Sequence, residues 1–106
     1  MLLTTTHVLQ GRTYEELGLA EGATIQTVHL GKDFVNGLKN LVGGELTSYY
    51  EMMEKARTVA TERLIACAER MGADAVIGVS YTTNSIVSSA AEILAYGTAI
   101  RFTDGK

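Results

Sequence analysis

The clearest pattern in the chain is a stripe of apolar residues that predicts one long amphipathic helix. The stripe recurs in steps of three and four over residues 49–71, the spacing that places side chains on one helical face. Its members are Tyr49, Met53, Ala56, Ala60, Leu64, Cys67 and Met71. Residues 48–51 (SYYE) have the form of a capping box, and Gly72 is placed to end the helix. We therefore predict a helix of about 23 residues, which would span roughly 35 Å.

Other apolar segments predict strands on either side of this helix. Residues 2–9 are rich in threonine and leucine, and residues 75–81 form an apolar run of strand length. Residues 92–102 alternate, as expected for a last strand. One side of that strand would carry Leu94, Tyr96, Thr98, Ile100 and Phe102. The polar residues 82–89 between these two strands read as a loop or hairpin tip, and residues 103–106 as a frayed tail.

A hairpin is predicted in the first third of the chain. Residues 13–20 and 24–30 both alternate loosely between apolar and polar positions. Glu21-Gly22 lies between them, and glycine accepts the positive φ that a two-residue hairpin turn requires. We read the segment as two strands joined at this turn.

A short second helix is predicted between the hairpin and the long helix. Asp33 is a plausible N-cap, and Gly43-Gly44 would end the helix. Its apolar residues are Phe34, Val35, Leu38 and Leu41.

Composition and charge then exclude several classes of protein. With 106 residues the chain is one domain, 1–106. Nine basic and twelve acidic residues give a net charge of −3 without a basic cluster, so we expect no nucleic-acid partner. The longest apolar run falls far short of the roughly 20 residues of a membrane span, so we expect no membrane association. A single cysteine and a start unlike a signal peptide predict a cytoplasmic protein.

The predicted helix is long for so small a chain. A domain of this length has a radius of gyration near 13 Å, so its diameter would scarcely exceed the helix. One such helix cannot cover both faces and both edges of a small sheet. Uncovered edges and apolar faces need partners, and we predict a homo-oligomer.

No catalytic constellation stands out among the reactive residues. Cys67 lies on the apolar stripe, which indicates a structural thiol. His7 and His29 fall on predicted strands and could share a metal ion, above all where an oligomer multiplies each ligand. The chain lacks a positioned nucleophile and base, so we expect no enzyme activity.

Four motifs carry a resemblance to a known family. They are residues 41–49 (LVGGELTSY), Ala56-Arg57, residues 72–79 (GADAVIGV) and residues 97–99 (GTA). In this order they resemble the YbjQ-like family of small bacterial and archaeal proteins, which is labelled as heavy-metal-binding. The resemblance covers nearly the whole chain.

The resemblance implies a fold and an assembly. It implies a two-layer, dodecin-subunit-like α+β domain, in which an antiparallel sheet packs on the long helix. It also implies that the subunits form a homo-oligomeric ring of five. Where the family has serine, glutamate and asparagine, this chain has Leu46, Tyr50 and His29. Oxygen ligands for a hard cation are therefore fewer, and one imidazole is added.

Together these observations favour a non-enzymatic, ring-forming protein that binds a small ligand or anion at its subunit junctions. Gly43, Gly44 and the start of the helix would supply amide donors, Arg57 a charge and Tyr49 a wall. One alternative is a metal-binding protein that uses the two histidines. Others are an interaction scaffold and an enzyme of unknown reaction. None of these hypotheses specifies a cofactor.

Overall fold

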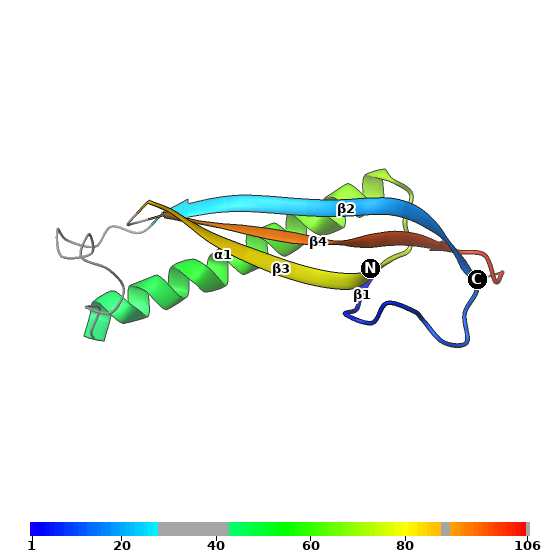
Figure 1. Ribbon diagram of the computed structural model, residues 1–106, viewed down its shortest axis with the longest axis horizontal. Coiled ribbons are helices and arrows are strands. Elements are labelled where there is room, and N and C mark those ends of the chain that lie inside the picture. Colours follow the sequence, from blue (N-terminus) through cyan, green and yellow to red (C-terminus); the bar gives the residue numbers. More distant parts are fainter. Residues whose placement is uncertain (28–42, 88–89, 106) are drawn as a thin grey trace.

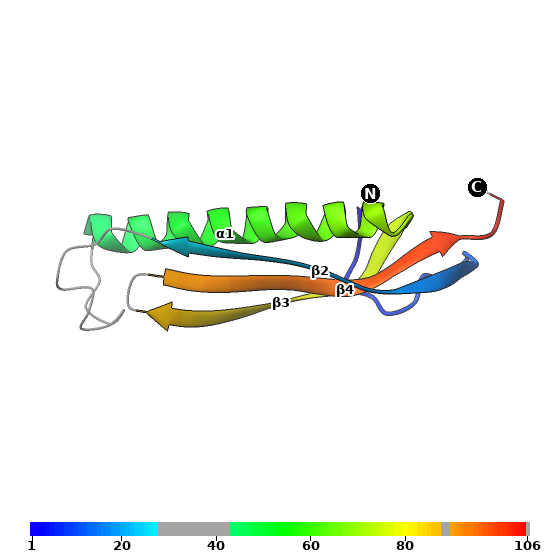
Figure 2. The same cartoon turned by 90° about the horizontal axis from the view of Figure 1, so that it is seen from above.

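The computed structural model describes residues 1–27, 43–87 and 90–105 (Figure 1). They form β1 (Leu2–Leu3), β2 (Tyr14–Thr27), α1 (Gly43–Arg70), β3 (Ala75–Val87) and β4 (Ala90–Phe102). The four strands make one sheet, and α1 lies along one face of it, so the predicted two-layer α+β architecture is confirmed (Figure 2). The molecule is elongated, with extents of 57, 23 and 16 Å. The predicted short helix and His29 lie outside the described residues.

The sheet is mixed, whereas a wholly antiparallel sheet was predicted. Its strand order is β1-β3-β4-β2. The central strand β4 pairs antiparallel with β2 and with β3, but β1 pairs parallel with β3. Parallel neighbours need a long crossover, and here the connection from β1 to β3 contains both β2 and α1. β2 thus forms one edge of the sheet. The other edge is formed by the two residues of β1 and, beyond them, by β3.

The long helix is confirmed, but it begins earlier than predicted. The stripe faces the sheet, and its central members Ala56, Ala60 and Leu64 are fully buried. α1 starts at Gly43, so Ser48 lies inside the helix and the predicted capping box at residues 48–51 is wrong. Glycine costs a helix only about 1 kcal/mol, far less than proline, and packing on the sheet outweighs such a penalty.

The predicted hairpin turn at Glu21-Gly22 is also wrong, because β2 runs through it without interruption. Gly22 pairs with Ala95 of β4 in the middle of the strand. A Cβ atom at Gly22 would lie 2.2 Å from the backbone nitrogen of Leu64 and 2.6 Å from the carbonyl oxygen of Ala60. The glycine therefore lets the helix backbone approach the strand, and close approach rather than a turn is the reason for it.

The strand β3 extends further than its apolar run. Its polar residues up to Val87 were predicted as a loop, yet they continue the ladder with β4, from Thr82 opposite Leu94 to Val87 opposite Ala90. Backbone hydrogen bonds to a central strand hold a segment extended whatever its side chains, and the exposed side chains of residues 82–85 are free to be polar. β3 and β4 are antiparallel neighbours, which agrees with the hairpin predicted between them.

The N-terminal strand is shorter than the predicted residues 2–9, because β3 bulges beside it. Gly78 adopts φ +63°, and the pairing register of β3 with β4 shifts there. The backbone nitrogen of Gly78 donates to the carbonyl of Thr6 at 2.7 Å, and that of Val79 donates to the carbonyl of Thr4 at 3.0 Å. The chain therefore leaves the ladder after Leu3.

A second, smaller core lies on the sheet face opposite α1. Ala75, Ile77 and Ile100 are buried there. Leu9 and Tyr14 pack against them, together with Phe102 at the end of β4. The segment that follows β1 thus closes this face of the sheet, but only at the end that lies near β1 (Figure 2).

Candidate functional site

An open hollow of about 450 Å³ lies between α1 and the neighbouring strand β3. Its lining residues are Glu54, Arg57, Thr58, Thr61, Glu62 and Tyr81. The hollow exists because α1 packs mainly over β2 and β4, and hardly touches β3. Tyr81 pairs with Ala95 and so belongs to the helix-covered face, yet its side chain is 42% exposed. We call this feature the Tyr81 hollow.

The hydroxyl groups of the Tyr81 hollow donate their hydrogen bonds to other groups of the same chain. Thr61 donates its hydroxyl proton to the carbonyl oxygen of Arg57 at 2.7 Å. A threonine has one hydroxyl proton, so in its 2.7 Å contact with Thr61 the phenol of Tyr81 is the donor. Thr58 likewise donates to the carbonyl of Glu54 at 3.1 Å. All three hydroxyl oxygens are left with lone pairs, so they offer acceptors to anything that enters.

The charged residues of the hollow add to its excess of hydrogen-bond acceptors. Glu54 and Glu62 add carboxylate acceptors, and Arg57 is the one cation among the lining residues, which gives a formal charge of −1. Among the ion pairs of the described part of the chain, none involves Arg57. The hollow as a whole therefore matches a donor-rich, positively charged group better than an anion.

A second shallow hollow of about 380 Å³ adjoins the first along the outer side of β3. Its lining residues are Leu3, Thr4, Thr5, Val79 and Tyr81, so Tyr81 is common to both hollows. From Ser80 onward, no strand in the described part of the chain pairs with the outer edge of β3. β2 has a free outer edge as well, since it pairs only with β4 among the described strands. Each side of the sheet can therefore accept another strand.

The opposite flank of α1 is basic. Arg63 and Arg70 are seven residues apart, so they lie on one helical face, and both are exposed. Arg63 donates to the carbonyl oxygen of Ala23 in β2 at 2.7 Å, which places this flank on the β2 side of the molecule. We call this pair of arginines the basic flank.

Over much of its length, the sheet face away from α1 is not covered by any segment that the structure describes. Leu19 and Ile25 of β2 are 63% and 58% exposed there. Their face also includes Leu94 and Tyr96 of β4, since these residues pair with Ala23 and Glu21. Exposed aliphatic side chains beside strand edges that no described strand pairs are typical of surfaces that bind a partner.

The four residues predicted to bind a ligand do not converge within one copy of the chain. Gly43 and Gly44 lie at the start of α1. Tyr49 is half-buried, and its ring meets that of Tyr50 edge-on at 6.4 Å between centroids. Arg57 lies on the same helix, about 20 Å further along its axis than Gly44 at 1.5 Å per residue, and lines the Tyr81 hollow. The amides and the arginine are therefore parts of different surfaces of the subunit.

His7, the predicted metal ligand that lies among the described residues, is not part of a metal-binding cluster there. His7 is exposed, and its ring lies against Gly78, where an added Cβ would come within 3.1 Å of Nδ1. Cys67 is a half-buried free thiol packed against the main core, as expected for a structural residue. Across the described ranges, no three His, Cys, Asp or Glu side chains come close enough to hold a metal ion. The described residues thus do not fit a metal site inside one copy, and the use of His29 stays a prediction.

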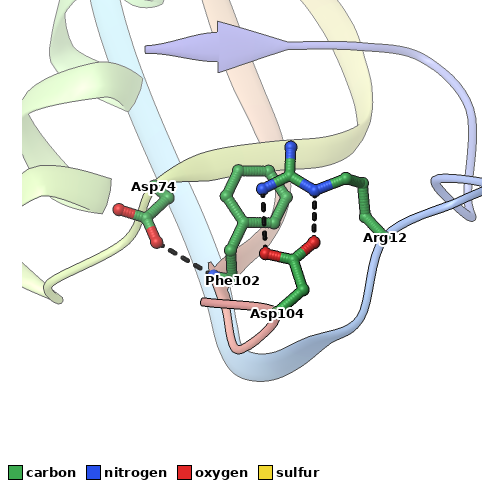
Figure 3. A network of polar contacts seen from close by, with 4 residues as sticks. All are labelled: Arg12, Asp74, Phe102 and Asp104. Carbon is green, nitrogen blue, oxygen red and sulfur yellow. Dashed lines mark hydrogen bonds and ion pairs between the residues drawn. The ribbon is translucent and has the colours of Figure 1, made fainter. Parts of the chain in front are cut away.

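Another charged cluster fastens the segment before β2 to the residues after β4 (Figure 3). Arg12 forms an ion pair with Asp104, and its guanidinium lies 3.7 Å from the centroid of the Phe102 ring. The hydrogen bond between Arg12 and Asp104 lowers the pKa of Asp104 and raises the pKa of Arg12. Asp74 accepts a 2.9 Å hydrogen bond from the backbone nitrogen of Phe102. We call the Arg12–Asp104 pair the latch, because it holds the segment that covers the second core.

Sequence reasoning missed the residues that make the Tyr81 hollow. Arg57 was singled out, but Tyr81 was read as the end of an apolar strand, and Thr61 was not singled out at all. Their contact depends on how far α1 is displaced toward β2, which local sequence patterns do not encode. The polar run after Tyr81 was the available signal, because a strand edge with polar side chains is typical of an exposed side of a sheet.

The helix of the described residues does not have the apolar length that a membrane crossing requires.

Comparisons with known proteins find relatives over almost the whole chain. The family model described as "Putative heavy-metal-binding" matches residues 1–103. A UPF0145 protein of Methanosarcina acetivorans is 50% identical over 95% of this chain and 96% of its own length. A UPF0145 protein of Clostridium novyi is 48% identical over 95% of this chain and 98% of its own length.

A solved structure has the same fold. It is a Pediococcus pentosaceus protein of unknown function from the DUF74 family, with a TM-score of 0.72. The similarity covers 97% of this chain and 98% of that one at 19% sequence identity, so it speaks for the fold alone.

Proposed function

This chain belongs to the YbjQ-like family, and we propose that it works as a subunit of a homo-oligomeric ring that binds a small ligand at its subunit junctions. The observation that carries the proposal is the unfinished sheet. Among the described strands, β2 and β3 leave unpaired edges on opposite sides, and Leu19 and Ile25 are exposed on one face. Of the described elements, α1 alone covers the other face.

Closed rings follow from contacts between two different surfaces of the same chain. Such heterologous contacts close into a ring when the rotation per subunit divides a full turn. The two free edges are different strands, β2 and β3, and therefore supply two different surfaces. A ring of five is the expectation that the family resemblance adds.

The ligand half of the proposal places an anion at the start of α1. The backbone amides of the first helical turn and the positive end of the helix dipole favour an anion at Gly43 and Gly44. Tyr49 lies one turn further on, whereas Arg57 is too distant to contribute from the same copy. In a ring, a neighbouring subunit would have to supply the positive charge.

Native mass spectrometry of gently purified protein, repeated after denaturation, tests both halves. A mass five times that of the chain is expected, with additional mass that disappears on denaturation. A monomer at micromolar concentration would contradict the assembly. A pentamer without additional mass would contradict ligand binding and would favour a scaffold.

A metal-binding function is the second candidate, because the family description names heavy metals. It would require ligands from several copies, with His7 and His29 as the predicted residues. Elemental analysis of the assembled protein separates this function from the first: a stoichiometric metal that a His29→Ala variant loses would favour it.

A further inference from the structure

The Tyr81 hollow and Arg63 of the basic flank lie on opposite sides of α1 but at the same height along the molecule. Tyr81 and Gly22 both pair with Ala95, so all three residues stand on one line across the sheet. Ala23, the next residue of β2, accepts the hydrogen bond from Arg63. Thr61, which bonds Tyr81, and Arg63 are two residues apart on the helix.

The two surfaces also complement each other in charge and in hydrogen bonding. The hollow offers the carboxylates of Glu54 and Glu62 as acceptors. Its threonine hydroxyls already donate to backbone carbonyls, so their oxygens can accept a hydrogen bond from outside. The guanidinium of Arg63 carries five N–H donors, of which the carbonyl of Ala23 uses one in the contact given by the structure. Acceptors thus face one side of the subunit and donors the other.

Because Tyr81 and Arg63 are level along the strands, a second copy can lie beside the first without a shift in the strand direction. β2 and β3 are both antiparallel to β4, so they run in the same direction. A second copy placed in the same orientation at the free edge of β3 presents its own β2 edge, and its Arg63 then arrives level with Tyr81. A contact without displacement along the strands is compatible with a closed ring, whereas a displaced one would lead to a helical filament.

We infer that the Tyr81 hollow is the docking site for the basic flank of a second copy of this chain, whose Arg63 donates hydrogen bonds to Tyr81 and to the carboxylates of Glu54 and Glu62. The inference rests on the proposed self-association and specifies its interface. Arg57 also lines the hollow, so it would lie within that interface.

Charge reversal tests this interface by sedimentation velocity over a dilution series. Glu62→Lys and Arg63→Glu should each raise the dissociation constant about tenfold or more, because like charges then face each other across the junction. The double variant carries both reversals and restores opposite charges at every junction, so it should return close to the wild-type value. Arg70→Glu is the matched control on the same flank and should have a smaller effect.

The possible results separate the interface from the assembly. A monomeric wild-type protein would overturn both the proposed ring and this inference. A wild-type oligomer that Glu62→Lys and Arg63→Glu leave intact would overturn the interface alone. A double variant no better than either single variant would overturn the pairing of these two surfaces. Glu62 is exposed, and its substitution keeps the test decisive even where Arg63→Glu disturbs the contact with Ala23.

Discussion

The sheet face away from α1 differs between its two ends in how far the chain covers it. Near β1, the face away from α1 is closed: Ile100 is fully buried there, and the segment that the latch holds lies over it. Toward the other end of the same strands no described segment covers the face, and Ile25 is 58% exposed. An isoleucine thus lies at each end, and only the one near β1 is covered by the described part of the chain.

This difference separates the residues that stabilise one copy of the chain from those that are available to a partner. A side chain covered by its own chain contributes to the free energy of unfolding of one copy. A side chain left in water contributes only when another molecule covers it. Substitutions at the two ends should therefore affect different measurements.

The comparison holds only while α1 remains packed on the sheet, and the largest effect is expected there. Gly22→Val would place a side chain against the backbone of α1, which cannot yield as a flexible side chain can. We expect a loss of about 4 kcal/mol or more in the free energy of unfolding. Urea denaturation measures it. Ala23→Val is the control, because its side chain is exposed on the other face; an equal loss in both variants would contradict the close approach.

The comparison itself is tested by a matched pair of isoleucine variants. Ile100→Ala removes a fully buried side chain and should lower the free energy of unfolding by about 3 kcal/mol. Ile25→Ala should change the unfolding of dilute protein by less than about 0.5 kcal/mol. It should instead weaken self-association in a dilution series.

Equal effects of both isoleucine variants on unfolding, with no effect of Ile25→Ala on association, would remove the distinction between the two ends.

The latch predicts a smaller effect that depends on pH. The hydrogen bond from Arg12 lowers the pKa of Asp104 below its ordinary 3.8. Its stabilisation is therefore complete above pH 3.8 and is lost as the pH falls through the lower pKa of the folded state. Asp104→Asn should lower the melting temperature slightly at neutral pH, and the difference from wild type should vanish in acid. Glu15→Gln, which removes the charge from the exposed ion pair with Arg101, is the control. A difference in melting temperature between Asp104→Asn and wild type that persists in acid would contradict the prediction.

The smallest expected effect concerns metal. Since the described residues do not fit a metal site within one copy, His7→Ala should leave the metal content of purified protein unchanged and well below one ion per chain. Elemental analysis of both proteins measures it. A stoichiometric metal in the wild type that is lost in His7→Ala would show that the closed end of the sheet contributes a ligand.

Features that depend on local pattern were predictable from the sequence. The stripe through Ala56, Ala60 and Leu64 gave the helix, because a period near 3.6 follows directly from burial of one face. The alternation over residues 92–102 gave the last strand for the corresponding reason. The expectation of partners at the sheet edges came from the length of the helix alone, and it stays a prediction.

Features that depend on distant residues were not predictable. Gly22 looks like a turn residue because only the later segment around Leu64 reveals what approaches it. The short β1 depends on the bulge at Gly78, far along the chain. Of the candidate site, Arg57 was found and Tyr81 was missed, since the hollow arises from the lateral position of α1 over the sheet.

The central place of β4 has a consequence for how the chain is made. β4 pairs with both β2 and β3, so most of the sheet depends on the described strand that a ribosome synthesises last. β2 must wait, unpaired, until residues 90–102 have emerged, and such long-range pairing is slow to form. During that interval its exposed edge and apolar side chains are open to the wrong partners. Completion of the final strand thus turns a segment prone to aggregation into an ordered edge.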